Sequence, residues 1–222
     1  MKFILTGTTG FVGGEVLAQC RRNPAISSIV VLTRRPLPDP IVADPKVQTI
    51  VLKDFKSYPA DVVKQLEDAD ACIWTLGARV AIPEVEIDYP LAFARAIAPT
   101  RTSQQTPFRY IYCSGILAER DQTKPLWVSP TNRRVKGAAE NSMIEFEEQN
   151  KGRWETYIVK PALIRAPEGD ILKSIRAYLM LIGTVRVNEL AAAMIDIVSR
   201  GNKQQTFLNA EIISTGQAAL GK

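Results

Sequence analysis

Short apolar runs alternate with amphipathic stretches along most of the chain. A short, mostly apolar run is typical of a strand covered on both faces, as strands of parallel sheets are. This pattern predicts strands at 2–5, 28–32, 47–52, 71–76, 109–113, 156–159 and 206–213.

Between these runs, apolar residues recur at helical spacing. Asn188 is expected to cap one helix that Gly201 ends. Helices are predicted at 12–23, 60–67, 87–98, 136–149, 170–182 and 188–200.

Strands that alternate with helices predict an α/β fold with a doubly wound parallel sheet. The expected strand order is 3-2-1-4-5-6, which gathers ligand-binding loops at the carboxyl edge of the sheet. No repeat or domain boundary is evident, so residues 1–222 are expected to form a single compact domain. Segments 117–129 and 166–182 would form a small roof on the substrate side.

The first predicted strand leads into a Gly-x-x-Gly-x-x-Gly turn that opens a helix. Gly7 would allow the tight turn, Gly10 the approach of a phosphate, and Gly13 close packing of helix on strand. The unpaired amides at a helix start bind phosphate groups well. The sequence therefore predicts a dinucleotide site here.

The second predicted strand is followed by Arg34 and Arg35 instead of the acidic residue that an NAD-specific site places there. Guanidinium groups suit a 2′-phosphate, so the expected cofactor is NADP(H); two solvated arginines are the alternative. After the third strand, Asp54 could accept a hydrogen bond from adenine, and Phe55 could cover the ring. Asp54 could equally cap a helix or lie in a solvated turn.

The amino-acid composition excludes several kinds of catalytic and binding site. The chain has no histidine, which excludes Ser-His-Asp and Cys-His mechanisms and disfavours zinc, so no metal site is expected. The net charge is +5, but the basic residues are scattered, which argues against nucleic-acid binding. Three cysteines in apolar surroundings indicate buried thiols, and no apolar run is long enough to span a bilayer. A cytoplasmic protein without membrane contact is expected.

The glycine turn, Ser114 at the end of the fifth strand, Lys136 at the expected start of a helix, and Lys160-Pro161-Ala162 carry a family resemblance. With them the chain resembles the atypical or extended short-chain dehydrogenase/reductases, within the NAD(P)-binding Rossmann, nucleoside-diphosphate-sugar epimerase-like group. The resemblance implies a Ser, Tyr, Lys constellation. In it tyrosine is the general acid, lysine holds the nicotinamide ribose, and serine orients the carbonyl.

The sequence departs from this pattern at the tyrosine. The family's tyrosine lies four residues before the lysine, and that position is Asn132. An asparagine can donate a hydrogen bond to a carbonyl, but it cannot supply the proton that an alkoxide needs. Tyr112, Asp121, the substrate or water remain as proton sources.

Three functions are therefore open: an NADPH-dependent reductase of a small carbonyl or enone substrate with an atypical proton donor, a non-redox isomerase or cyclase that uses the same pocket, and a non-enzymatic NADP(H) sensor. Ser114 and Lys136 could also be a loop hydroxyl and a solvated lysine. Their positions, however, favour ligand roles: a lysine in the first turn of a helix opposes the helix dipole.

The expected catalytic residues are thus Ser114, Lys136 and Asn132. A small-molecule substrate is the expected partner. If the 170–182 helix exposes part of its apolar face, a homodimer or an apolar substrate would explain it. Trp127 could cap the core or line the substrate pocket. The cofactor is expected to contact Gly7, Thr8, Thr9, Gly10, Phe11, Val12, Arg34, Arg35, Asp54, Phe55, Leu76, Gly77, Lys136, Pro161 and Leu163.

Overall fold

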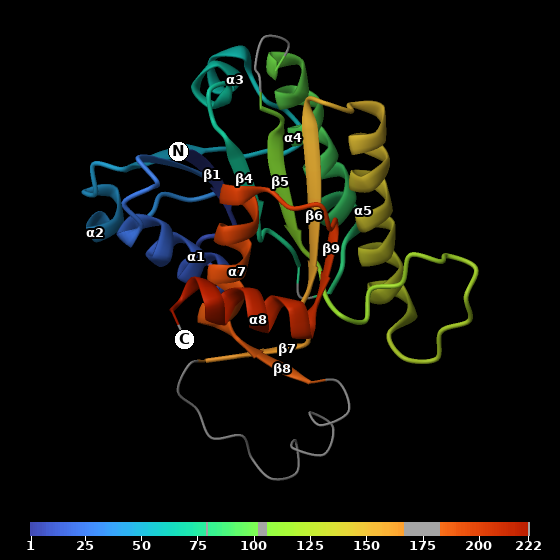
Figure 1. Cartoon of the computed structure of the whole chain (residues 1–222). Coiled ribbons are helices and arrows are strands. Elements are labelled where there is room, and N and C mark those ends of the chain that lie inside the picture. Colours follow the sequence, from blue (N-terminus) through green and yellow to red (C-terminus); the bar gives the residue numbers. More distant parts are fainter. Residues whose placement is uncertain (79, 102–105, 167–182, 222) are drawn as a thin grey trace.

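A seven-stranded parallel sheet forms the centre of the molecule (Figure 1). The computed structural model describes residues 1–78, 80–101, 106–166 and 183–221. The strand order β3-β2-β1-β4-β5-β6 confirms the predicted topology, and β9 adds a strand beyond β6. The strands are β1 (Lys2–Thr6), β2 (Ser28–Thr33), β3 (Val47–Val51), β4 (Ala71–Trp74), β5 (Phe108–Cys113), β6 (Trp154–Lys160) and β9 (Thr206–Leu208).

Successive residues of the central strands enter two separate cores, because side chains alternate between the faces of a sheet. In β1, Phe3 and Leu5 belong to one core and Ile4 to the other. On the first face lie α1 (Phe11–Arg22), α7 (Val187–Arg200) and α8 (Asn209–Ala219). On the second lie α3 (Ala60–Leu66), α4 (Tyr89–Ile97) and α5 (Pro130–Gln149).

The second core is rich in aromatic side chains. Trp154 contacts the rings of Phe108, Tyr110 and Phe146, with centroids 4.9 to 5.6 Å apart. Phe93 of α4 packs on the same rings. Each such ring buries a large apolar area, so this cluster fixes α4 and α5 against the first residues of β5 and β6.

Four smaller elements complete the described chain, one of them a 3₁₀ turn (Ala98–Arg101) directly after α4. A short helix, α2 (Asp39–Val42), interrupts the Pro-rich connection after β2, and a π-helical turn (Glu84–Asp88) precedes α4. A second, two-stranded parallel sheet pairs β7 (Leu163–Arg165) with β8 (Thr184–Arg186).

The start of α5 differs from the prediction. The helix begins at Pro130, six positions before Lys136, so Lys136 lies in its second turn. Proline suits the first position of a helix because its φ is already helical and its missing N–H needs no partner. The polar residues of this turn gave no apolar repeat, so the expectation that Lys136 lies in the first turn of the helix was wrong, while its ligand role stays a prediction.

Two other boundaries near the end of the chain are also corrected. The predicted strand 206–213 ends at Leu208, and α8 follows because the Glu211 carboxylate accepts the Leu208 N–H at 2.7 Å. Likewise Arg186, not Asn188, is the cap residue of α7, and the Glu189 carboxylate accepts its backbone N–H at 3.2 Å. The predicted 170–182 helix lies outside the described residues.

Candidate functional site

The glycine turn between β1 and α1 is closely packed. Gly7 has a φ of +69°, and a Cβ there would lie 2.6 Å from the backbone of Thr75. A Cβ on Gly13 would overlap the Gly7 carbonyl oxygen, so α1 can approach β1 only with glycine at both positions. Gly10, the N-cap of α1, places no side chain on the helix end, and no acidic residue lies in the first turn. The first amides of α1 are therefore available to an anion.

A pocket of about 410 Å³ opens beside this turn, at the carboxyl ends of β1 and β2. Its polar wall includes Thr8, Thr9 and Thr33, and its apolar wall includes Phe55 and Leu76. Phe55 is almost fully buried and stacks on Tyr89, so it forms part of the inner wall.

The pocket is cationic. Arg34 and Arg35 both line it, and no described residue forms an ion pair with either. The Thr33 hydroxyl shapes their loop by donating to the Arg35 carbonyl oxygen at 2.9 Å. The buried Thr8 hydroxyl has no hydrogen-bond partner among the described residues. These groups are suited to an anionic ligand with several acceptor oxygens.

The predicted cofactor residues are only partly gathered in this pocket. Asp54 is exposed and accepts the Lys56 N–H at 2.9 Å, which makes it a turn residue, and its adenine contact stays a prediction. The pocket also contains Leu32 and Thr33, which the glycine and arginine signals did not single out. Gly7, Thr8, Thr9, Arg34, Arg35, Phe55 and Leu76 line the pocket, whereas Gly10, Phe11, Val12, Asp54, Gly77, Lys136, Pro161 and Leu163 are not among its lining residues.

Beyond β4, the side chain of Lys136 is paired with Glu86. The Lys136 Nζ lies 3.2 Å from the Glu86 Oε2, and the Tyr112 hydroxyl donates to the same oxygen at 2.6 Å. The Glu86 Oε1 accepts the Ala78 N–H at 2.9 Å. One fully buried carboxylate thus joins α5, β5 and the segment that follows β4.

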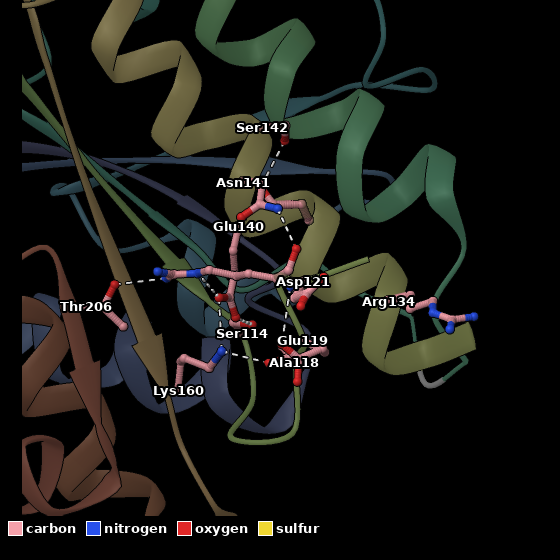
Figure 2. A network of polar contacts seen from close by, with 12 residues as sticks. Ser114, Ala118, Glu119, Asp121, Arg134, Glu140, Asn141, Ser142, Lys160 and Thr206 are labelled. Atoms are coloured by element: carbon pink, nitrogen blue, oxygen red, sulfur yellow. Dashed lines mark hydrogen bonds and ion pairs between the residues drawn. The ribbon is translucent and has the colours of Figure 1, made fainter. Parts of the chain in front are cut away.

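Ser114 belongs to a second buried network, around Glu140 of α5. The Ser114 hydroxyl donates to one Glu140 oxygen, while Arg120 and Lys160 contact the other at 2.6 and 3.0 Å. Figure 2 shows the side chains of Ser114 and Lys160 directed toward Glu140. Arg120 also donates to Thr206 of β9, so the network ties the loop after β5 to the edge of the sheet.

Asn132 has a different contact. Its Oδ1 accepts the Ala81 N–H at 2.9 Å, which fixes the orientation of the side-chain amide because only the oxygen can accept. No described residue accepts a hydrogen bond from its Nδ2. This nitrogen is therefore a donor that a ligand could use.

The α5 helix explains how these contacts are arranged. Asn132, Lys136 and Glu140 follow one another at intervals of four, so they form a stripe along one face of the helix. The structure thus places the three predicted catalytic residues in one region. Asn132 is held by Ala81, Lys136 by Glu86 and Ser114 by Glu140. The sequence did not lead us to Glu86 or Glu140. Glu140 could have been found, because it lies four residues after Lys136 on the same helix face. No sequence pattern marked Glu86.

The two side chains that the sequence offered as proton donors, Tyr112 and Asp121, have unsuitable pKa values. Burial raises the pKa of the Tyr112 hydroxyl well above its ordinary value, and Glu86 raises it further. The Asp121 carboxyl has a lowered pKa because the Thr123 side chain and backbone donate hydrogen bonds to it, so it holds no proton at neutral pH. Trp127 is 92% exposed, so it does not cap the core.

No protein-family model matches the chain. Among curated proteins, it is similar to leucinostatins biosynthesis cluster protein T of Purpureocillium lilacinum, with 28% identity over 192 residues that span 78% of this chain and 68% of that protein.

Solved structures show the fold directly. Vestitone reductase from alfalfa matches with a TM-score of 0.69 and 18% identity, over 94% of this chain and 76% of that one. Yeast methylglyoxal/isovaleraldehyde reductase complexed with NADPH matches with a TM-score of 0.70 and 16% identity, over 94% and 78% of the two chains. The chain therefore has a Rossmann-like α/β fold.

A third match extends the range of chemistry that this fold carries. The dTDP-glucose 4,6-dehydratase of Bacillus anthracis, in complex with NAD, matches with a TM-score of 0.67 and 10% identity, over 100% of this chain and 82% of that one. The resemblance to short-chain dehydrogenase/reductases is thus confirmed at the level of the fold. In the described part of the chain, no helix is long and apolar enough to cross a membrane.

Proposed function

We propose that this chain is an NADPH-dependent reductase of a small carbonyl or enone substrate. The observation that carries the proposal is the cationic pocket beside the glycine turn, where Arg34 and Arg35 lie without ion-pair partners among the described residues. The yeast methylglyoxal/isovaleraldehyde reductase, whose structure was solved with NADPH, shares the fold, which supports the choice.

The residues present fit the cofactor. The amides at the start of α1 would hold the pyrophosphate, the Thr8 hydroxyl would donate to a phosphate oxygen, and the two arginines would bind the 2′-phosphate. When bound, the reduced nicotinamide supplies a hydride to the substrate. On the chain's side, Asn132 would donate its Nδ2 hydrogen to the substrate oxygen and so polarise the carbonyl.

The pocket can be tested by titrating the protein with NADPH and NADH while following nucleotide fluorescence. Arg34→Ala and Arg35→Ala should each weaken NADPH binding about tenfold, because each removes charge-assisted hydrogen bonds to phosphate, and should leave NADH binding nearly unchanged. Arg153→Ala is the matched control, since this exposed arginine precedes β6 at the opposite edge of the sheet. A preference for NADH that neither pocket substitution alters would contradict the proposal.

A non-enzymatic NADP(H) sensor is the second candidate. It is favoured by one observation: Ser114 and Lys136 are both bound to internal carboxylates, and residue 132 is not a tyrosine. Incubation with NADPH and a panel of aldehydes, ketones and enones separates the two functions. Substrate-dependent loss of NADPH absorbance requires turnover, whereas tight NADPH binding without turnover on any member of the panel favours the sensor.

A further inference from the structure

The fully buried carboxylate of Glu86 does not line the pocket beside the glycine turn, and its surroundings are unusual. It lies in the π-helical turn Glu84–Asp88 between β4 and α4. Single π turns are rare and often occur at functional sites. Its three donors come from three different parts of the fold: the Ala78 N–H, the Tyr112 hydroxyl and the Lys136 ammonium.

This set of donors suits a carboxylate side chain. A backbone N–H, a phenol and an ammonium all donate, and only a carboxylate accepts from all three without contributing a proton of its own. The Tyr112 phenol keeps its proton, because ionisation would place a second negative charge beside Glu86 in a buried site. Lys136 is therefore the proton-bearing group of this cluster that remains accessible, with 27% of its side chain exposed.

We propose that Lys136 is the proton donor of the reaction and that Glu86 is the positioning residue that holds its ammonium group. This inference rests on the proposed function. After a hydride from reduced nicotinamide has been added to the carbonyl carbon, the carbonyl π electrons reside on oxygen. An N–H bond of Lys136 then breaks as the O–H bond of the alcohol forms, and the neutral amine regains a proton from water.

The helix stripe supports this assignment. Asn132 lies one turn before Lys136 on the same face of α5, and both are tied to the segment after β4, at Ala81 and Glu86. A carbonyl oxygen that accepts from Asn132 would thus lie near the Lys136 ammonium. The ion pair with Glu86 holds that ammonium in place on this face of α5.

Other ionisable groups face Lys136 as well. Cys113 of β5 interacts with it electrostatically, but burial raises the pKa of this thiol to about 11, so the thiol is neutral at physiological pH. Tyr112 is neutral for the reason given above, and Glu140, one turn along α5, is neutralised by Arg120 and Lys160. Glu86 is thus the anion that Lys136 contacts directly.

The pairing can be measured without any substrate. An amine-reactive anhydride modifies only amines that are free to react, so the rate of Lys136 acylation, followed by peptide mass mapping at neutral pH, reports whether the side chain is held in its ion pair. Glu86→Gln should raise this rate about tenfold, because the amide no longer pairs with the Lys136 ammonium. Glu84→Gln is the matched control: it removes a carboxylate from the same π turn, but one that pairs with Lys56. Equal rates in the wild type and both variants would overturn the positioning role.

Turnover variants test the proton. Lys136→Arg keeps the positive charge but releases a proton far less readily. It should retain NADPH binding within a few fold and lose carbonyl reduction at least a hundredfold, whereas full activity would overturn Lys136 as the donor. Glu86→Gln should lower kcat much more than it changes KM, because Lys136 is no longer held in position. Tyr112→Phe keeps the ion pair and should lower kcat less. It replaces Glu86→Gln if that variant does not fold.

The outcomes separate this inference from the proposed function. A wild-type protein that binds NADPH but reduces no member of the carbonyl panel contradicts the reductase and the proton transfer together, while acylation still decides whether Glu86 holds Lys136. An active wild type with an equally active Lys136→Arg contradicts the inference alone.

Discussion

The carboxyl edge of the sheet has two halves that differ in how their polar side chains are satisfied. Beyond β1 and β2, the Thr8 hydroxyl and the guanidinium groups of Arg34 and Arg35 have no described partners. Beyond β4, β5 and β6, the corresponding side chains are held by the buried carboxylates Glu86 and Glu140. The polar side chains of the first half are open to a ligand, whereas those of the second half are already paired with carboxylates of the protein.

This difference has an energetic consequence. An unpaired polar group costs free energy in the absence of ligand, so removing it leaves the stability unchanged or increases it. A buried charge that has lost its partner is strongly destabilising. Substitutions in the two halves should therefore change the free energy of unfolding in opposite directions.

The largest effect is expected at Glu140. Glu140→Gln removes the negative charge shared by Lys160, whose side chain is only 10% exposed, and Arg120. We expect a loss of about 3 kcal/mol in the free energy of unfolding, because a nearly buried cation is left unpaired. Urea denaturation of the free protein measures it. Glu148→Gln, at an exposed position of the same helix, should change the stability by less than about 0.5 kcal/mol.

A loss below about 1 kcal/mol in Glu140→Gln would show that this network is no stronger than a surface ion pair. The distinction between the halves would then fail, because the second half would be as loosely held as the first.

What the sequence could predict follows the same division. The strands, the order of the sheet and the glycine turn before α1 depend on local patterns, such as apolar runs and the spacing of Gly7, Gly10 and Gly13. Arg34 and Arg35 were recognised because their position after the second strand has a known relation to the ribose. These signals lie within a few residues of the groups that they describe.

The second half depends on contacts between distant parts of the chain. Glu86 meets Lys136 across 50 positions, and Glu140 meets Ser114 across 26. Glu86 reaches its site through a π turn, which has no sequence signature comparable to a glycine motif. Tertiary packing decides which side chains meet in this way. Ser114 and Lys136 could therefore be predicted from the sequence, but Glu86 and Glu140, the carboxylates that hold them, could not.

An intermediate effect is expected at Thr8, in the first half. Thr8→Val removes a buried, unpartnered hydroxyl and keeps the shape of the side chain. The free protein should be as stable as the wild type or gain about 1 kcal/mol, while NADPH binding should weaken about tenfold through the lost hydrogen bond to phosphate. Calorimetric titration and urea denaturation measure the two changes.

Thr49→Val is the matched control for this substitution. Thr49 also has a buried hydroxyl without a described partner, but it lies in β3 and does not line the pocket. It should show a similar effect on stability and none on NADPH affinity. If both variants bind NADPH equally well, the Thr8 hydroxyl does not face the ligand.

The smallest effect is expected at Ser129, the residue before α5. Its φ of +46° lies in the left-handed region, and its side chain makes no capping hydrogen bond. The Arg120–Glu140 ion pair fixes the loop before this residue. The Glu119 N–H donates to the Arg133 carbonyl oxygen and fixes the start of the helix after it. Together these contacts hold the backbone at Ser129. Ser129→Gly should relieve the strain and raise the free energy of unfolding by at most about 1 kcal/mol, because glycine adopts this conformation freely but loses more chain entropy.

The same replacement inside the helix should act in the opposite direction. Ser142→Gly, in the middle of α5, is expected to lower the stability by about 0.5 kcal/mol, since a helical glycine gains nothing to offset its entropy. Urea denaturation of both variants compares the signs directly. If Ser129→Gly is destabilising too, the left-handed residue is not a source of strain, and the start of α5 is set by its proline instead of by the paired network around it.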